Sequence, residues 1–172
     1  MKLIPTIIRT AALTVILASA ASAQAGLVNG RFTAGLTGWQ TVGDASVQAP
    51  FNTLGLPMES ARALVLTTAS LFDDDVSGQN GAFNLSGHSA VDVSSELAPF
   101  AHAAPEQLEL DPVDHTAPSI EGSAARQTTL VKTGDTLSFN WNLFSRDRDM
   151  PDTAWLVIAP VSGPNEVITL GS

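Results

Sequence analysis

The sequence predicts an all-β fold, mainly antiparallel, arranged as a jelly-roll-like β-sandwich with one short helical insertion near residues 94–103. Two observations favour this fold class. First, short apolar segments recur along residues 26–172 with Gly, Pro, Asn and Asp between them, a pattern typical of sandwiches. Second, the chain contains no Cys, so a hydrophobic core rather than a disulfide framework must stabilise it, and residues 26–172 are long enough for one such domain.

Eight segments are expected to form strands. They are residues 27–32, 39–42, 45–48, 62–67, 123–132, 136–144, 153–159 and 166–170. The clearest is 136–144, in which apolar Leu137, Phe139, Trp141 and Leu143 alternate with polar residues. This period of two predicts a strand with one buried face, and it therefore places Trp141 in the core.

A turn is expected between the fifth and sixth of these segments. Gly134 and Asp135 lie directly between 123–132 and 136–144, and both residue types tolerate the backbone angles that tight turns need. The two segments should therefore pair as an antiparallel hairpin.

The segment 153–159 is apolar on both faces of the pleat. Such a strand is usually central in its sheet and covered on both sides. The covering element is expected to be the helix near residues 94–103, with Ser94 or Ser95 as its N-cap and Glu96 in its first turn.

Residues 1–25 have the three zones of a secretory signal peptide. Lys2 and Arg9 make the first zone positive, residues 11–20 are apolar and uncharged, and small residues follow that permit cleavage after Ala23 or Ala25. The apolar stretch is about half of the roughly 20 residues that span a bilayer. We therefore expect a protein that is secreted or held in the cell envelope, with no membrane segment after cleavage.

The chain is acidic, with 17 Asp and Glu against eight Lys and Arg and a net charge of −9. Removal of residues 1–25 takes away two basic residues and no acidic one, which moves the net charge to −11. This charge excludes nucleic acids and anionic membranes as partners, because both require clustered Lys and Arg. It suits a soluble secreted protein, including one that meets divalent cations.

Five stretches of the sequence resemble known secreted proteins. Residues 27–32 (LVNGRF) and 35–39 (GLTGW) resemble the opening of jelly-roll, galactose-binding-like domains of carbohydrate-binding modules. Residues 122–128 (GSAARQT), 134–142 (GDTLSFNWN) and 152–157 (DTAWLV) resemble secreted bacterial proteins that end in a PEP-CTERM, exosortase-sorted anchor. The resemblance implies a sandwich fold and an envelope or exopolysaccharide setting, with extracellular polysaccharide or cell-surface components as partners. It does not imply an enzyme.

The chain departs from these proteins in two places. Thr33 stands where the opening motif usually has Glu, which removes a possible calcium ligand. The resemblance also implies further strands and a sorting anchor beyond Ser172. The sandwich formed by residues 26–172 is therefore expected to be incomplete at its C-terminal end. The alternative is a short natural variant with an open sheet edge.

One acidic loop resembles half of a calcium site. Asp73, Asp75 and Ser77 offer oxygen ligands at alternate positions, which makes calcium the one cofactor that the sequence suggests. The twelfth position of such a loop holds Asn84 instead of the bidentate Glu that completes an EF-hand. A solvated acidic turn is the favoured interpretation.

A second acidic cluster follows the segment 136–144. Asp147, Asp149 and Asp152 are candidates for the rim of a ligand site, because loops at the end of a sandwich often carry function. Two Arg residues interleave with them, so local ion pairs explain the same charges.

No catalytic residue is predicted. Gly87-His88-Ser89-Ala90-Val91 approaches the nucleophile elbow of hydrolases, but Val91 replaces the final Gly of that strained turn. A plain turn is therefore the favoured interpretation. The three His residues lack the close spacing of a zinc site.

These features together predict a secreted, non-catalytic β-sandwich protein of a surface or extracellular matrix, in an exopolysaccharide or biofilm setting. The alternatives are a carbohydrate-binding module and a secreted hydrolase. An exposed Trp among Trp39, Trp141 and Trp155 would favour the carbohydrate-binding module, because sugars stack on exposed aromatic rings.

Overall fold

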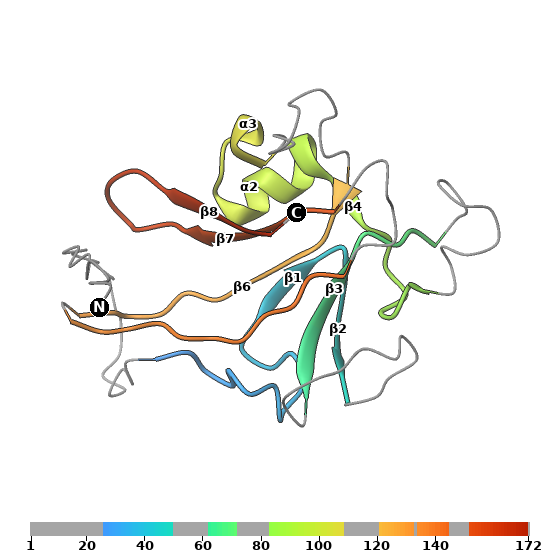
Figure 1. Cartoon of the computed structure of the whole chain (residues 1–172), viewed down its shortest axis with the longest axis horizontal. Helices are drawn as coiled ribbons and strands as arrows, with labels where there is room; N and C mark the ends of the chain where they lie inside the picture. The colour runs from blue at the N-terminus through green and yellow to red at the C-terminus, as the bar shows by residue number, and fades with distance from the viewer. Residues whose placement is uncertain are drawn as a thin grey trace, which may run out of the picture.

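A computed structural model describes residues 26–49, 62–71, 83–108, 121–132, 134–144 and 152–171. The described chain is rich in strands, which form four antiparallel pairs, and it contains little helix (Figure 1). This confirms the antiparallel β class. Within these residues the four pairs do not join into the two packed sheets of a jelly roll. The expected signal peptide, residues 1–25, lies outside the described chain.

Eight short strands make up the four pairs. They are β1 (Gln40–Val42), β2 (Asp44–Gln48), β3 (Ala63–Thr67), β4 (Val91–Asp92), β5 (Glu121–Gly122), β6 (Ala124–Arg126), β7 (Ala154–Ile158) and β8 (Glu166–Gly171). β2 pairs with β3, β7 with β8, β1 with β6 and β4 with β5. The last two pairs bring together residues that lie far apart in sequence, such as Gln40 and Arg126. Six of the eight expected strands overlap an observed one.

The helical insertion lies where the sequence predicts it. A π-helical turn, η1 (Val93–Leu97), continues into α2 (Ala98–Ala101), and a further turn, α3 (Pro105–Leu108), follows. In the described chain no helix is long and apolar enough to cross a bilayer.

The cap of this insertion is Asp92, so the expectation of Ser94 or Ser95 as N-cap is wrong. Asp92 Oδ1 accepts hydrogen bonds from Ser95 N at 2.7 Å and from the hydroxyl groups of Ser94 and Ser95 at 2.8 Å. The backbone N–H of Ser95 is the largest cause of a lowered pKa at the Asp92 carboxyl, and the two hydroxyl groups act in the same direction. The Ser residues thus donate to the cap.

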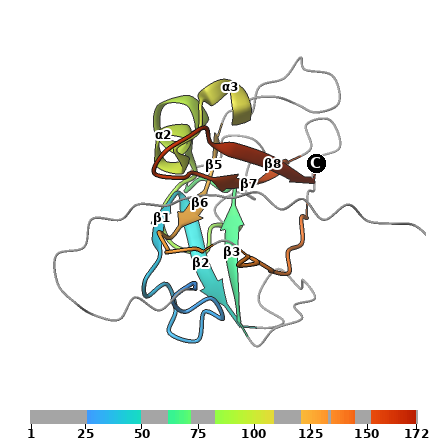
Figure 2. The same cartoon turned by 90° about the vertical axis from the view of Figure 1, so that its left-hand side faces the viewer.

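The hydrophobic core lies between the helical insertion and the strands around it. Its buried members are Val93, Leu97, Ala98 and Leu108, and partly buried side chains from β1, β4, β6, β7 and β8 pack against them. Both views place α2 and α3 beside β7 and β8 at one end of the molecule, with β2 and β3 at the other (Figures 1 and 2). Trp155 and Val157 of β7 thus pack against the helical insertion, as expected. The expectation of a central strand covered on both sides is wrong, because in the described chain β7 pairs with β8 alone and Ile158 is 44% exposed.

The prediction of a strand over residues 27–32 is wrong, because these residues form turns. Asn29 adopts a positive φ of +53°. Its Oδ1 accepts from Ala34 N at 3.1 Å, and its Nδ2 donates to Gly35 O at 2.8 Å. An Asn side chain that bonds to nearby backbone in this way offers an alternative to a β ladder.

The expected hairpin over 123–144 forms only its turn. Asp135 N donates to Lys132 O at 3.0 Å, Lys132 N donates to Asp135 Oδ2 at 2.8 Å, and Gly134 has φ +95°. Residues 136–144 nevertheless belong to no strand, and Trp141 is 48% exposed. The expectations of a strand at 136–144 and of a buried Trp141 are both wrong.

The physical reason lies in the segment that should have paired with 136–144. Gln127 Nε2 donates to Val28 O at 3.0 Å and to Gly38 O at 2.8 Å, and Val28 N donates to Gln127 Oε1 at 2.6 Å. Thr129 Oγ1 donates to Gly26 O at 2.8 Å. These side chains attach the segment to the N-terminal turns, so β6 ends at Arg126 instead of continuing to residue 132.

Candidate functional site

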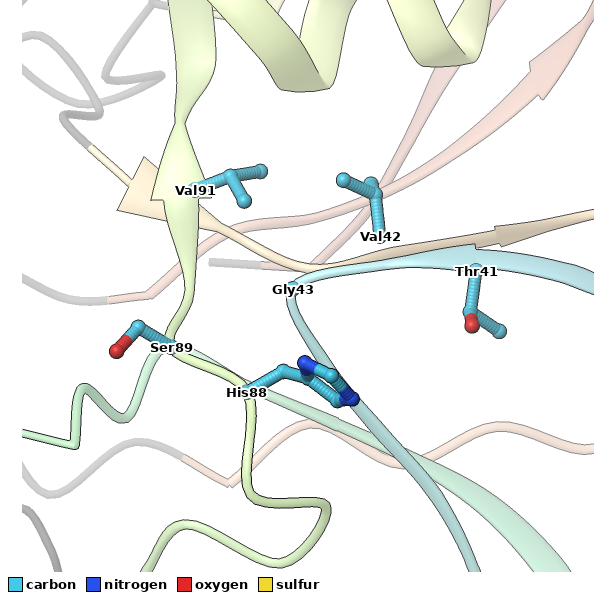
Figure 3. A pocket seen from close by; sticks show the side chains of 6 residues that line it. All are labelled: Thr41, Val42, Gly43, His88, Ser89 and Val91. Atoms are coloured by element: carbon cyan, nitrogen blue, oxygen red, sulfur yellow. The ribbon is translucent and has the colours of Figure 1, made fainter.

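A small hollow lies between β1 and the loop that leads into β4. Its volume is about 360 Å³, and its lining residues are Thr41, Val42, Gly43, His88, Ser89 and Val91. Figure 3 shows Val42 and Val91 pointing toward one another, while the His88 ring extends from its loop toward Gly43. The hollow therefore combines an apolar wall with one imidazole and two hydroxyl groups, those of Thr41 and Ser89.

Gly43 fixes one side of this hollow. It has φ +76°, and a Cβ added there would lie 2.7 Å from Gly122 O and 2.9 Å from Ser123 Cα. A side chain cannot fit without a shift of the neighbouring backbone. Glycine thus lets the end of β1 approach the β5–β6 segment closely.

Asp44, the next residue, is fully buried and fixes the opposite loop. Its carboxylate accepts from Thr67 Oγ1 at 2.5 Å, from Ser86 N at 2.7 Å and from Leu85 N at 3.0 Å. Its own N–H donates to Ser123 Oγ at 2.7 Å. Because protein donors already point at both carboxylate oxygens, Asp44 acts as an internal anchor for the loop that carries His88.

Asn84 holds the same loop from inside. Its Nδ2 donates to Ala69 O at 3.1 Å and to His88 O at 2.6 Å, and its Oδ1 accepts from Gly87 N at 2.8 Å. This residue occupies the twelfth position of the expected calcium loop, but its side chain is used to close a turn. The turn keeps His88 at the edge of the hollow.

Ser89 does not form a nucleophile with His88. Its Oγ accepts from Leu71 N at 3.0 Å and lies 3.5 Å from Ser70 Oγ. Figure 3 shows its hydroxyl group pointing away from the imidazole. Residues 87–91 thus lead from a turn into β4, which agrees with the interpretation that the sequence favoured.

Most of the expected ligand residues lie outside the described chain. These are Asp73, Asp75 and Ser77 of the calcium loop, and Asp147 and Asp149 of the acidic rim. The remaining member, Asp152, accepts from Thr68 Oγ1 at 3.4 Å. In the part of the chain that the structure describes, no three His, Asp or Glu residues lie close enough together to hold a metal ion. The calcium site and the rim stay predictions.

No motif in the sequence predicts the cluster of contacts around Arg126. Arg126 Nε donates to Gln40 Oε1 at 2.8 Å, and Nη1 donates to Phe100 O at 2.5 Å and lies 2.9 Å from His102 Nε2. Its guanidinium carbon also lies 4.3 Å from the centre of the Phe100 ring, as in a cation–π contact. The cluster joins β1, β6 and the end of α2, so its evident task is structural.

The largest departure from expectation is an exposed line of apolar side chains on 136–144. Leu137, Phe139 and Trp141 are 52%, 45% and 48% exposed, and we call these three residues the apolar row. One edge of the Trp141 ring lies near Gly171 at the end of β8, where an added Cβ would approach Cη2 to 3.1 Å. The rest of the row is available to a partner.

The other two Trp residues are more covered. Trp155 packs against the core, and the Trp39 ring lies 5.2 Å from that of Phe32. Both are half-buried, whereas Trp141 is exposed. The apolar row therefore contains the aromatic surface of the described chain that is best placed for an interaction.

Comparison with known proteins assigns this chain to no family. No protein-family model, curated protein or solved structure matches this chain. The resemblance to PEP-CTERM proteins and to jelly-roll carbohydrate-binding modules stays an expectation. Two residues of the resembling stretches nevertheless have a visible structural task, since Asn29 and Gln127 hold the turns of residues 26–38.

Proposed function

We propose that this chain is a secreted, non-catalytic protein of a bacterial surface or extracellular matrix, which acts by adhesion in an exopolysaccharide setting. Its antiparallel strand pairs are then parts of a jelly-roll-like β-sandwich. The single observation that supports this function best is the apolar row, because contiguous exposed apolar side chains mark interaction surfaces.

The charge distribution fits the same role. Residues 136–144 carry no charged side chain, in a chain whose net charge is −9. A high net charge keeps a protein soluble, while an uncharged apolar segment provides a place where another surface can approach. Adhesion through this segment needs neither a metal ion nor a catalytic group.

Adsorption of the exported chain to particles of insoluble polysaccharide tests the proposal. We expect wild-type protein to be depleted from solution, and a Phe139→Ala/Trp141→Ala double variant to bind about tenfold more weakly because its aromatic surface is gone. A Thr136→Ala/Ser138→Ala variant of the same segment is the matched control and should bind like wild type. No retention of wild-type protein, or equal retention of all three, would overturn the proposal.

A carbohydrate-binding module is the second candidate, and the exposed rings of Phe139 and Trp141 favour it. A module of this kind recognises particular sugars, whereas general adhesion does not. Soluble oligosaccharides of the retained polysaccharide should therefore compete with adsorption only if the second candidate is correct. The secreted hydrolase stays a prediction, although the contacts of Ser89 do not support a nucleophilic pair with His88.

A further inference from the structure

The contact between Arg126 of β6 and His102 at the end of α2 requires an uncharged imidazole. Arg126 Nη1 lies 2.9 Å from His102 Nε2. A guanidinium group has no lone pair to offer, so its N–H must donate and Nε2 must accept. The proton of the neutral ring is therefore on Nδ1. A protonated ring has an N–H donor at both nitrogens, and it cannot make this contact.

We propose that the Arg126–His102 contact is a pH latch, which holds the end of the helical insertion to β6 at neutral pH and releases it in mildly acidic surroundings. Histidine side chains ordinarily take up a proton between about pH 5 and 8. Protonation fills the lone pair of His102 Nε2 and places a second positive charge beside the guanidinium group. A hydrogen bond thus becomes a repulsion between like charges.

The backbone holds His102 in the position where its ring meets Arg126. His102 is the C-cap of α2 and adopts a left-handed φ of +56°. Its N–H donates to Pro99 O at 3.2 Å, and Ala103 N donates to Ala98 O at 3.0 Å across the same turn. Arg126 is held in turn by acceptors from β1 and from α2. Because both groups are held by other hydrogen bonds, a charge on the ring acts directly on their contact.

The surroundings of the contact do not neutralise a second positive charge. β1 and the loop before β8 face it with uncharged side chains, those of Gln40 and Asn165. In the described chain no carboxylate forms an ion pair with Arg126 or His102. More distant carboxylates act through water and salt, which screen them. The acidic residues of the neighbouring elements are Glu96 of η1, Glu106 of α3 and Glu166 of β8.

The latch also reaches the β7–β8 hairpin. Asn165 Nδ2, which lies directly before β8, donates to His102 O. The turn at His102 therefore connects this hairpin to β6, and its release should loosen both connections together. His102 itself is exposed and lies outside the buried core cluster. We therefore expect a local opening at the end of α2, with the core intact.

Nitrogen-15 NMR of the imidazole rings in the exported chain tests the geometry. At about pH 8, His102 should carry its proton on Nδ1 and have an unprotonated Nε2, because Nε2 accepts from Arg126. As the pH falls to about 5.5, protonation of this ring should be accompanied by shifts of the backbone amide signals of Ala103 and Asn165. A His102 ring protonated on Nε2 at about pH 8 would overturn the proposal.

Melting temperatures test the consequence for stability. Only the neutral ring makes the contact, so its contribution is present at about pH 8 and is lost as the pH falls to about 5.5. Over this range the melting temperature of wild type should fall by about 2–4 °C more than that of His102→Asn, which does not titrate and tolerates a left-handed backbone. His88→Asn is the matched control, because His88 is also exposed and makes no contact with an Arg in the described chain. It should follow wild type.

Removal of the guanidinium group separates the latch from a general effect of histidine charge. In an Arg126→Gln background, the further change His102→Asn should alter the pH dependence of the melting temperature by less than about 1 °C. The proposal is wrong if this difference stays as large as in wild type, or if wild type and His102→Asn respond equally to pH. Should Arg126→Gln fail to fold, the NMR tautomer and the exposed His102→Asn variant still decide.

Discussion

Two regions of the molecule use their side chains in opposite ways. In the first, which we call the packed centre, Leu108 of the core cluster is 2% exposed and Asp44 is fully buried with hydrogen bonds to both oxygens. In the second, which we call the arm and which comprises residues 127–132 and 134–144, apolar side chains that alternate like those of a strand remain exposed. Apolar alternation alone therefore does not decide which segments of this chain pack.

The largest difference between the two regions is expected for a leucine. Leu108→Ala removes a side chain that packs in the core, and we expect a loss of about 3 kcal/mol in the free energy of unfolding. Leu137→Ala in the arm removes a side chain that is 52% exposed and should cost less than about 1 kcal/mol. Denaturant unfolding at low protein concentration measures both, and equal losses would mean that the arm is packed as well as the centre.

The next comparison is between two aspartates, Asp44 in the packed centre and Asp135 in the arm. Asp44→Asn turns an amide group toward N–H and O–H donors, which leaves at least one buried donor without an acceptor and should cost about 2 kcal/mol. Asp135→Asn changes an exposed turn of the arm and should cost less than about 1 kcal/mol. Denaturant unfolding measures both losses. In the Asp44→Asn variant, exchange broadening of the His88 signals in NMR spectra would show that the loop has loosened. If Asp135→Asn lowered the free energy of unfolding as much as Asp44→Asn does, the anchoring role of Asp44 would be contradicted.

Glycine gives a smaller and more specific difference. Gly43 and Gly134 have φ values of +76° and +95°, so alanine is strained at both. Only at Gly43 would the added Cβ also meet backbone, at 2.7 Å from Gly122 O, whereas nothing lies within 4 Å at Gly134. Gly43→Ala should therefore lose about 1 kcal/mol more stability than Gly134→Ala. Identical melting temperatures would show that the β1 and β5–β6 segments do not approach so closely.

These comparisons also explain what could be predicted from the sequence. The strands at 153–159 and 166–170 and the helix near 94–103 were predictable because each has a local apolar pattern, and these apolar residues also meet in the core. The turn at Gly134 and Asp135 was predictable for the same reason, because its hydrogen bond joins residues only three positions apart. Each of these signals depends on residues that lie close together in the sequence.

The rest depends on partners that no local pattern reveals. The period of two over 136–144 is a real strand signal, but Gln127 and Thr129 direct the neighbouring segment to residues 26–38 instead. Asp44 has no motif, since its donors come from Thr67, Leu85 and Ser86. The hollow beside His88 could not be placed from sequence for the same reason.

The smallest expected effect concerns the pH dependence of the helix cap. The backbone N–H of Ser95 and the hydroxyl groups of Ser95 and Ser94 lower the folded-state pKa of Asp92 below its ordinary 3.8. A carboxyl with a lowered pKa adds stability above its unfolded-state pKa, and this stability is lost as the pH falls through the folded-state value. The melting temperature of wild type should therefore exceed that of Asp92→Asn at pH 7 and pH 5, and the gap should narrow below pH 3.8. A gap that stays constant down to pH 2.5 would mean that the charge of Asp92 contributes nothing to the stability of the cap.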